Sequence, residues 1–232
     1  MDVLTDDHER EQFVRAWWHE YWKPITFGVV IAIAGLLGYR QWQAYQLEQT
    51  QQQAYALYQI QTKLALKDST ASADAEKFIS EHADLYGSLL SLDLATLKAA
   101  AGKFDEALKN IEFAREHGGQ LVAPAAMLAE ARVKAQNKDF DGALKILSDI
   151  KDEAYIIERN ETEGDILLSK GDRQGAHDAY KKALDISVER KVPINALLQM
   201  KFDSVIKAGD EPAYVIADKN NTEIAKNRGE TR

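Results

Sequence analysis

The residues with side chains suited to catalysis or metal binding are few and widely separated. The chain has no cysteine, which excludes thiol catalysis, disulfides and cysteine-ligated zinc. His19 and Glu20 begin a pattern similar to the H-E-x-x-H zinc motif, but Lys23 stands where the second histidine ligand would have to be. The sequence contains five histidines, none of them in a metal-ligand pattern: His8, His19, His82, His117 and His177. We therefore predict no metal site.

The remaining polar residues also favour structural roles. His177 occupies a position that leucine takes in two related segments, and a single histidine without a second ligand or base forms no acid–base pair. We expect it to pack between helices. Asp105-Glu106, and Asp139 with Asp141, lie near expected helix starts, where the helix dipole favours negative charge, so we interpret them as helix ends. We predict that the chain is not an enzyme and binds neither a cofactor nor a small-molecule substrate.

The composition is that of a mostly polar, acidic chain. Its 232 residues are enough for one sizeable domain and an accessory segment. The formal net charge is −8, the pI is about 5.2 and the mean hydropathy is −0.40. Because a phosphate backbone selects a basic protein surface, this charge balance argues against nucleic acid as a partner.

One apolar run near the N-terminus interrupts this polar chain. Residues 24–39 carry no formal charge. As a helix they would span about 24 Å, a little less than the ~30 Å hydrocarbon core of a bilayer. Aromatic and basic residues, which favour the two headgroup regions, flank the run and extend it. The membrane-interface residues that we predict are Trp17, Trp18, Trp22, Lys23, Arg40 and Trp42.

Other interpretations of the apolar run are weaker. A cleaved signal needs a small-residue site after its apolar core, but the A-x-A tripeptide at residues 32–34 lies inside the run. A buried core helix would not need tryptophans at both ends. We therefore predict a retained transmembrane anchor at residues 24–42.

The distribution of lysine and arginine predicts the orientation of this anchor. The N-terminal flank carries Arg10, Arg15 and Lys23, whereas the C-terminal flank carries Arg40 and then a long stretch without basic residues. Positive charge is enriched on the cytoplasmic side. We therefore expect residues 1–23 to form a cytoplasmic tail and the chain after the anchor to be exported.

Small residues within the anchor allow two interpretations. Gly28 with Ala32, and Ala34 with Gly38, form small-xxx-small pairs that permit close approach of another membrane helix. These four residues are a candidate helix-packing face. Glycine and alanine are also common in membrane helices, and we favour this simpler explanation, in which the anchor is a tether.

Beyond the anchor, one amphipathic pattern recurs three times. Each copy carries an alanine on its apolar stripe, and the three are Ala107, Ala143 and Ala176. Their spacings of 36 and 33 residues bracket the 34-residue period of tetratricopeptide repeats. Twelve positions earlier each copy has a small residue, where the two helices of a repeat would cross closely: Ala95, Ala131 and Gly164.

These patterns predict an all-α fold, with a single N-terminal transmembrane helix followed by an α-solenoid of tetratricopeptide-like helix pairs. No sustained period-two alternation indicates strands. We expect a helical connector at residues 43–72, the repeat domain at 73–208 and a polar C-terminal tail at 209–232.

A solenoid of helix pairs has a concave groove lined by the first helix of each pair. By repeat register, Thr96, Arg132 and Asp165 share one groove-facing position, and Gln136 belongs to another. We predict these four residues as a candidate partner groove. The alternative is that they belong to ordinary solvated helix faces.

Four blocks of the sequence resemble one known family. They are GVVIAIAGLLGYRQW at residues 28–42, AEKF at 75–78, YGSLLSLDLA at 86–95 and LLSKGDRQGA at 167–176. The family is that of YfgM-type ancillary subunits of the SecYEG translocon. The resemblance implies a single-pass bacterial inner-membrane protein with a cytoplasmic N-terminus and a periplasmic tetratricopeptide-like domain. It further implies association with the translocon and with a membrane-anchored periplasmic chaperone of the prolyl isomerase class.

Two classes of function remain open at this point. In the first, the domain is a protein-binding module that assists export of envelope proteins at the translocon. In the second, it is a holdase-like chaperone that contacts clients directly, or a regulator of an envelope stress response. A groove with charged anchors favours the first, and a broad exposed apolar patch favours the second.

Overall fold

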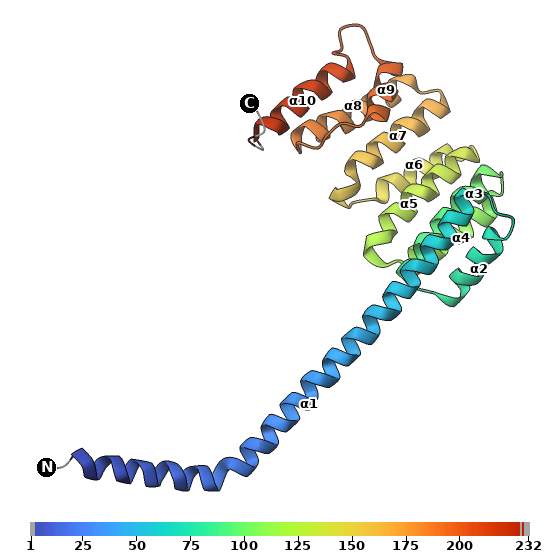
Figure 1. Cartoon of the computed structure of the whole chain (residues 1–232). Coiled ribbons are helices and arrows are strands. Elements are labelled where there is room, and N and C mark those ends of the chain that lie inside the picture. The colour runs from blue at the N-terminus through green and yellow to red at the C-terminus, as the bar shows by residue number, and fades with distance from the viewer. Residues whose placement is uncertain (1–2, 228, 230–232) are drawn as a thin grey trace. The chain divides into compact units, whose positions relative to one another are not determined.

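The computed structural model describes residues 3–227 and 229, with only the backbone described for residues 3–10, 12 and 13. Its elements are α-helices and one short 3₁₀ helix, and the described residues form no strand, so the all-α prediction is confirmed (Figure 1). The elements are α1 (Val3–Ala65), α2 (Ala71–Glu81), α3 (Leu85–Ala100), α4 (Phe104–His117), α5 (Gly119–Gln136), α6 (Phe140–Asp149), η1 (Glu153–Tyr155), α7 (Ile156–Lys170), α8 (Arg173–Glu189), α9 (Ala196–Val205) and α10 (Ala213–Asn227).

The chain divides into two compact units, residues 1–56 and 57–232. The first unit consists almost entirely of α1, which is long and apolar enough to cross a membrane. The helix does not begin at Pro24, the first residue of the predicted anchor, but contains that proline in its interior. Proline removes one backbone hydrogen bond and bends a helix, and Figure 1 shows α1 bending within its dark-blue part. The predicted anchor and connector are therefore parts of one helix.

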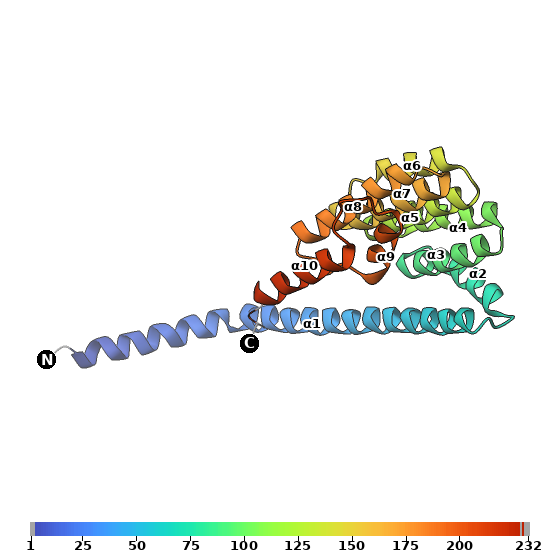
Figure 2. The same cartoon turned by 90° about the horizontal axis from the view of Figure 1, so that it is seen from above.

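The second unit contains the three helix pairs that the sequence copies predict. Contacts join α3 to α4, α5 to α6 and α7 to α8. The first helices also contact one another, α3 with α5 and α5 with α7, as expected when repeats stack. Figures 1 and 2 show the pairs following one another in chain order from green to red. The tetratricopeptide-like solenoid is therefore confirmed.

The repeat alanines lie where the two helices of a pair meet. Ala107, Ala143 and Ala176 are each 0% exposed, and their small counterparts on the first helices are also buried. The third pair shows why the counterpart must be small. A Cβ atom added to Gly164 would lie 2.4 Å from Cε1 of Tyr180, so the aromatic ring packs directly on the glycine backbone. Close packing of this kind leaves no space for a larger side chain.

Each turn between paired helices contains one residue with a positive φ, in the left-handed backbone conformation. Gly102 and Gly171 occupy this position in two repeats with φ of 75° and 93°, and Lys138 occupies it in the other with φ of 65°. The following aspartate caps the second helix: Asp139 accepts from the backbone N–H of Gly142 at 3.0 Å. Because a side chain crowds the backbone at positive φ, lysine is less favourable here than glycine.

Replacing this lysine should stabilise the repeat domain. We expect Lys138→Gly to raise the free energy of unfolding by about 0.5–1 kcal/mol, since relief of left-handed strain outweighs the larger entropy of glycine in the unfolded chain. The reciprocal change, Gly102→Lys, should lower it by a similar amount. Urea unfolding followed by circular dichroism would measure both. A shift of the same sign for the two variants would contradict this account.

At the N-terminal end of the second unit, the last turns of α1 lie beside α3. Leu57 and Leu64 are each 8% exposed. Gln61 donates to Asp93 of α3 at 2.7 Å. Residues 57–65 of the segment predicted as a connector therefore belong to the second compact unit.

At the C-terminal end, the predicted polar tail at residues 209–232 is wrong for the part that the structure describes. Residues 213–227 form α10, which contacts α8 and α9 (Figure 2). Ala213 and Ala217 join a core cluster with Phe202. The segment looked like a tail because most of its residues are polar, and two of its buried positions are the small residues Ala213 and Ala217. These small residues allow α10 to pack closely on the preceding helices.

Candidate functional site

A hollow on the solenoid surface lies between α5 and α7, the first helices of neighbouring repeats. Its volume is about 280 Å³, and it is lined by Arg132, Ala135, Gln136, Thr162, Asp165, Ile166 and Ser169. It therefore brings together three of the four residues predicted for the partner groove. The repeat period explains this arrangement, because equivalent positions on adjacent first helices lie side by side in a solenoid.

Arg132 spans the hollow from one helix to the other. Its guanidinium Nη2 donates to Oγ1 of Thr162 at 2.9 Å. Thr162 is fully buried, whereas Arg132 is exposed. A guanidinium carries five N–H donors, so the bond to Thr162 fixes its position and leaves further donors for an external carboxylate or carbonyl. Gln136, one helical turn further along, is also exposed.

Asp165 is held by internal partners. Tyr180 Oη donates to its Oδ1 at 2.8 Å, and Lys201 Nζ donates to its Oδ2 at 2.8 Å. Lys201 also donates to Glu161 at 2.6 Å, so this network joins α7 to α8 and α9. Asp165 therefore orders the wall of the hollow, while Arg132 and Gln136 are the more accessible groups.

The titration of this network reflects its burial and its partners. The pKa of the Tyr180 hydroxyl is raised above its ordinary value. Burial is the largest cause, and the hydrogen bond to Asp165 is the second. Burial alone would lower the pKa of Lys201, but its hydrogen bonds to Asp165 and Glu161 outweigh burial and raise it. Lys201 therefore stays protonated and the Tyr180 hydroxyl stays neutral near neutral pH.

Thr96, the fourth predicted groove residue, lies elsewhere. It lines a separate hollow of about 370 Å³ between α3 and the last turns of α1, together with Gln61 and Asp93. Its hydroxyl donates to the carbonyl of Leu92 in its own helix at 3.0 Å. The sequence copies did not reveal that the end of α1 lies beside α3.

The predicted anchor residues all lie on α1. The four tryptophans are exposed, with Trp17 at 47%, Trp18 at 57%, Trp22 at 40% and Trp42 at 57%. Lys23 and Arg40 are exposed as well. The residues predicted for the membrane interface are therefore not buried within the described chain.

The small residues of the anchor have open surroundings within the chain. Gly28, Ala32, Ala34 and Gly38 are exposed, and a Cβ atom added to either glycine would meet nothing within 4 Å. Nothing within the described chain therefore requires small residues at these positions.

Comparison with known proteins identifies the family. Residues 15–207 match the family model described as a tetratricopeptide repeat-like domain. Three similar relatives are each named ancillary SecYEG translocon subunit. The Escherichia coli protein is 27% identical over 88% of this chain and 99% of its own. The Aggregatibacter actinomycetemcomitans protein is 31% identical over 79% of this chain and 91% of its own. The Haemophilus influenzae protein is 28% identical over 78% and 89%.

The chain belongs to the YfgM-type family of ancillary SecYEG translocon subunits. The family match includes most of α1 and extends through α9, whereas α10 lies beyond residue 207. The part of the chain shared with the family therefore contains the candidate anchor and the hollow between α5 and α7. The helix that the sequence did not predict lies outside the shared part.

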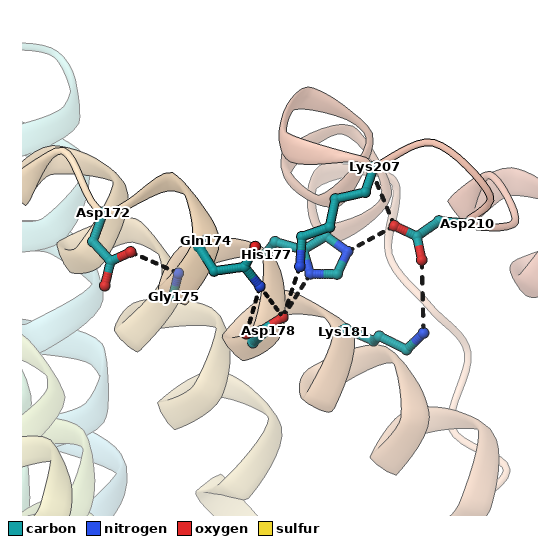
Figure 3. A network of polar contacts seen from close by, with 8 residues as sticks. All are labelled: Asp172, Gln174, Gly175, His177, Asp178, Lys181, Lys207 and Asp210. Atoms are coloured by element: carbon teal, nitrogen blue, oxygen red, sulfur yellow. Dashed lines mark hydrogen bonds and ion pairs between the residues drawn. The ribbon is translucent and has the colours of Figure 1, made fainter.

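A polar network around His177 is a further feature of this family member, and sequence reasoning missed it (Figure 3). His177 is 3% exposed, as expected for a packed histidine. Its Nδ1 lies 2.7 Å from Oδ1 of Asp178, and its Nε2 lies 2.8 Å from Oδ2 of Asp210. Lys207 Nζ donates to Asp178 at 3.2 Å, and its backbone N–H donates to Asp210 at 3.0 Å. The network fixes the loop between α9 and α10 to α8.

Both carboxylates of the network are stabilised in their charged form. The hydrogen bond with His177 is the largest cause that lowers the pKa of Asp178 far below its usual range. The pKa of Asp210 is lowered mainly by its hydrogen bond from the backbone N–H of Lys207, and secondly by its hydrogen bond with His177. No signal in the sequence pointed to this pairing, because Asp210 lies 33 residues from His177 in a segment without a repeat pattern.

Among the described side chains, no group of three or more histidine, cysteine or acidic residues is arranged to hold a metal ion.

Proposed function

We propose that this protein is an inner-membrane-anchored, protein-binding module that assists the export of envelope proteins at the SecYEG translocon. In this proposal α1 crosses the membrane once with its N-terminus in the cytoplasm, and the solenoid lies in the periplasm. The names of the relatives, the repeat fold and the apolar helix support it. Its partners are the translocon and a membrane-anchored periplasmic chaperone of the prolyl isomerase class.

The observation that carries this proposal is the polar lining of the hollow between α5 and α7. Five of its seven lining residues are polar, and Arg132 is already fixed by a hydrogen bond to Thr162. A preorganised donor of this kind favours recognition of a defined carboxylate or backbone carbonyl on a folded partner. A holdase would instead require a broad apolar surface, which this hollow does not provide.

Site-specific photocrosslinking in native membranes tests the proposal. A photoreactive amino acid at Gln136, at the edge of the hollow, is expected to give adducts with a translocon subunit or the chaperone. Lys145 is the matched control, because it is exposed on the second helix of the same repeat. Adducts at Lys145 together with none at Gln136 would overturn the groove as the binding surface.

A second variant separates recognition from folding. Arg132→Gln removes the charge and most donors but keeps a shorter, polar side chain. We expect adducts from position 136 to fall about tenfold in this variant, because a charge-assisted hydrogen bond contributes roughly 1.5–3 kcal/mol. Unchanged adduct yield in a folded Arg132→Gln protein would exclude Arg132 from partner binding.

A further inference from the structure

A cavity near the C-terminal end lies between α8 and α10, apart from the hollow between α5 and α7. Its volume is about 540 Å³, within the range of sites that bind ligands or peptide side chains. We call it the α8–α10 cavity. Its apolar floor is formed by Val188, Phe202 and Ile216. Phe202 is 1% exposed and belongs to the core, so the floor is a fixed part of the fold.

One wall of the α8–α10 cavity is held in place by the histidine network. Asp210 lines the cavity and is bonded to His177 and to the backbone of Lys207 (Figure 3). Lys181, also in the lining, lies 3.9 Å from the other oxygen of Asp210. The loop before α10 is therefore positioned before any ligand arrives, which lowers the ordering cost of binding.

A buried amide in the lining has an unused acceptor. Asn220 is 2% exposed, and its Nδ2 donates to the carbonyl of Val192 at 2.8 Å. This bond fixes the orientation of the amide. Its Oδ1 has no hydrogen-bond partner within the described chain. A buried acceptor without a donor is unfavourable, and a ligand with N–H groups would satisfy it.

The charges around the cavity select a cation. The lining holds five carboxylates and two lysines, a net charge of −3. Lys219 is paired with Glu211 at 2.5 Å, and Lys181 faces Asp210. The other three carboxylates form no ion pair with described residues: Asp185, Glu189 and Glu223. The site therefore presents unneutralised negative charge next to apolar side chains, and its lining includes Asn220, whose buried Oδ1 has no partner within the described chain.

We propose that the α8–α10 cavity binds a basic segment of a partner polypeptide, in which an arginine lies beside an aliphatic residue. The guanidinium has enough donors to reach the carboxylates of α8 and α10 and the amide oxygen of Asn220. The aliphatic stem and the neighbouring apolar side chain cover the floor. This inference rests on the proposed protein-binding function and adds a second site with a stated partner chemistry.

Binding of short labelled peptides to the full-length protein in non-ionic detergent tests this inference. The first peptide has arginines flanking a leucine, the second has glutamine for each arginine, and the third has serine for the leucine. We expect the first to bind most tightly and with an affinity that falls as salt is raised, because exposed ion pairs are screened. Equal binding of the first and third peptides would overturn the inference in favour of a general acidic surface.

Variants of the protein locate the binding site. Glu189→Gln with Glu223→Gln removes two unpaired carboxylates from the lining and should weaken binding of the first peptide about tenfold. Glu116→Gln with Asp149→Asn is the matched control, since both residues are exposed on α4 and α6 and the net charge changes equally. Equal affinities of the two double variants would overturn the assignment.

A direct readout keeps this test separate from that of the proposed function. A diazirine in place of the leucine should crosslink to residues on α8 or α10, as mapped by mass spectrometry. Adducts confined to other helices would refute the α8–α10 cavity. Crosslinking from Gln136 in native membranes does not depend on this cavity, so either site can fail while the other stands.

Discussion

Ala143→Glu is expected to lower the free energy of unfolding of the solenoid by about 3 kcal/mol or more. Ala143 is 0% exposed on α6 and packs in a core cluster with Ala131 and Leu147. A glutamate here would force the paired helices apart and place a charge where the cluster offers only apolar contacts. Urea or thermal unfolding of the full-length protein, followed by circular dichroism, measures the loss.

The control for this prediction lies two residues away on the same helix. Lys145 is exposed, so Lys145→Glu introduces the same side chain without burying it. We expect its effect to stay within about 0.5 kcal/mol, as for most surface changes. If Ala143→Glu were as stable as Lys145→Glu, Ala143 would not lie at a close helix crossing.

A reporter that is active only after export should be fully active when fused to the C-terminus of the complete chain. The expectation follows from three basic residues before the apolar run against one after it. The fusion must follow α10, because cutting the chain before Ala213 would remove a helix whose alanines are buried in the core. An inactive export reporter, together with full activity of a reporter that works only in the cytoplasm, would remove the basis for periplasmic partners.

Reversing the charge bias gives the matched control for orientation. In this variant glutamine replaces the basic residues of the N-terminal flank, and lysine replaces nearby glutamines after Arg40. The exchanged positions are Arg10, Arg15 and Lys23 on one side and Gln41, Gln43 and Gln46 on the other. We expect reporter activity to fall strongly, since the helix keeps its length but the positive side changes. Unchanged activity would mean that another feature sets the orientation.

The sequence by itself determined the repeat architecture, because the relevant information is local and periodic. Ala107, Ala143 and Ala176 recur at nearly constant spacing, and all three are fully buried. An amphipathic helix must bury its apolar stripe, so a repeated stripe predicts stacked helix pairs before any coordinates are known. The same local signal indicated that Arg132 and Asp165 occupy equivalent positions on neighbouring helices.

The ends of the solenoid could not be predicted with the same success. The local pattern indicated that the segment before residue 72 is helical, but not that Leu57 and Leu64 are buried within the second unit. The segment after residue 208 is mostly polar, and two of the four buried residues of α10 are alanines, which give only a weak apolar signal. Only contact with a neighbouring helix decides whether such a segment is ordered, because most of the stability of a helix comes from tertiary packing.

Only the tertiary structure decided which polar groups meet. His177 and Asp210 are 33 residues apart, and Tyr180 reaches Asp165 across a helix pair. These contacts depend on loop path and helix crossing, which no sequence period encodes. The same holds for the α8–α10 cavity, whose acidic rim and unpaired Asn220 oxygen come from helices that the sequence does not link. Periodicity fixes which face of each helix is buried, whereas packing in three dimensions fixes which side chains that face places together.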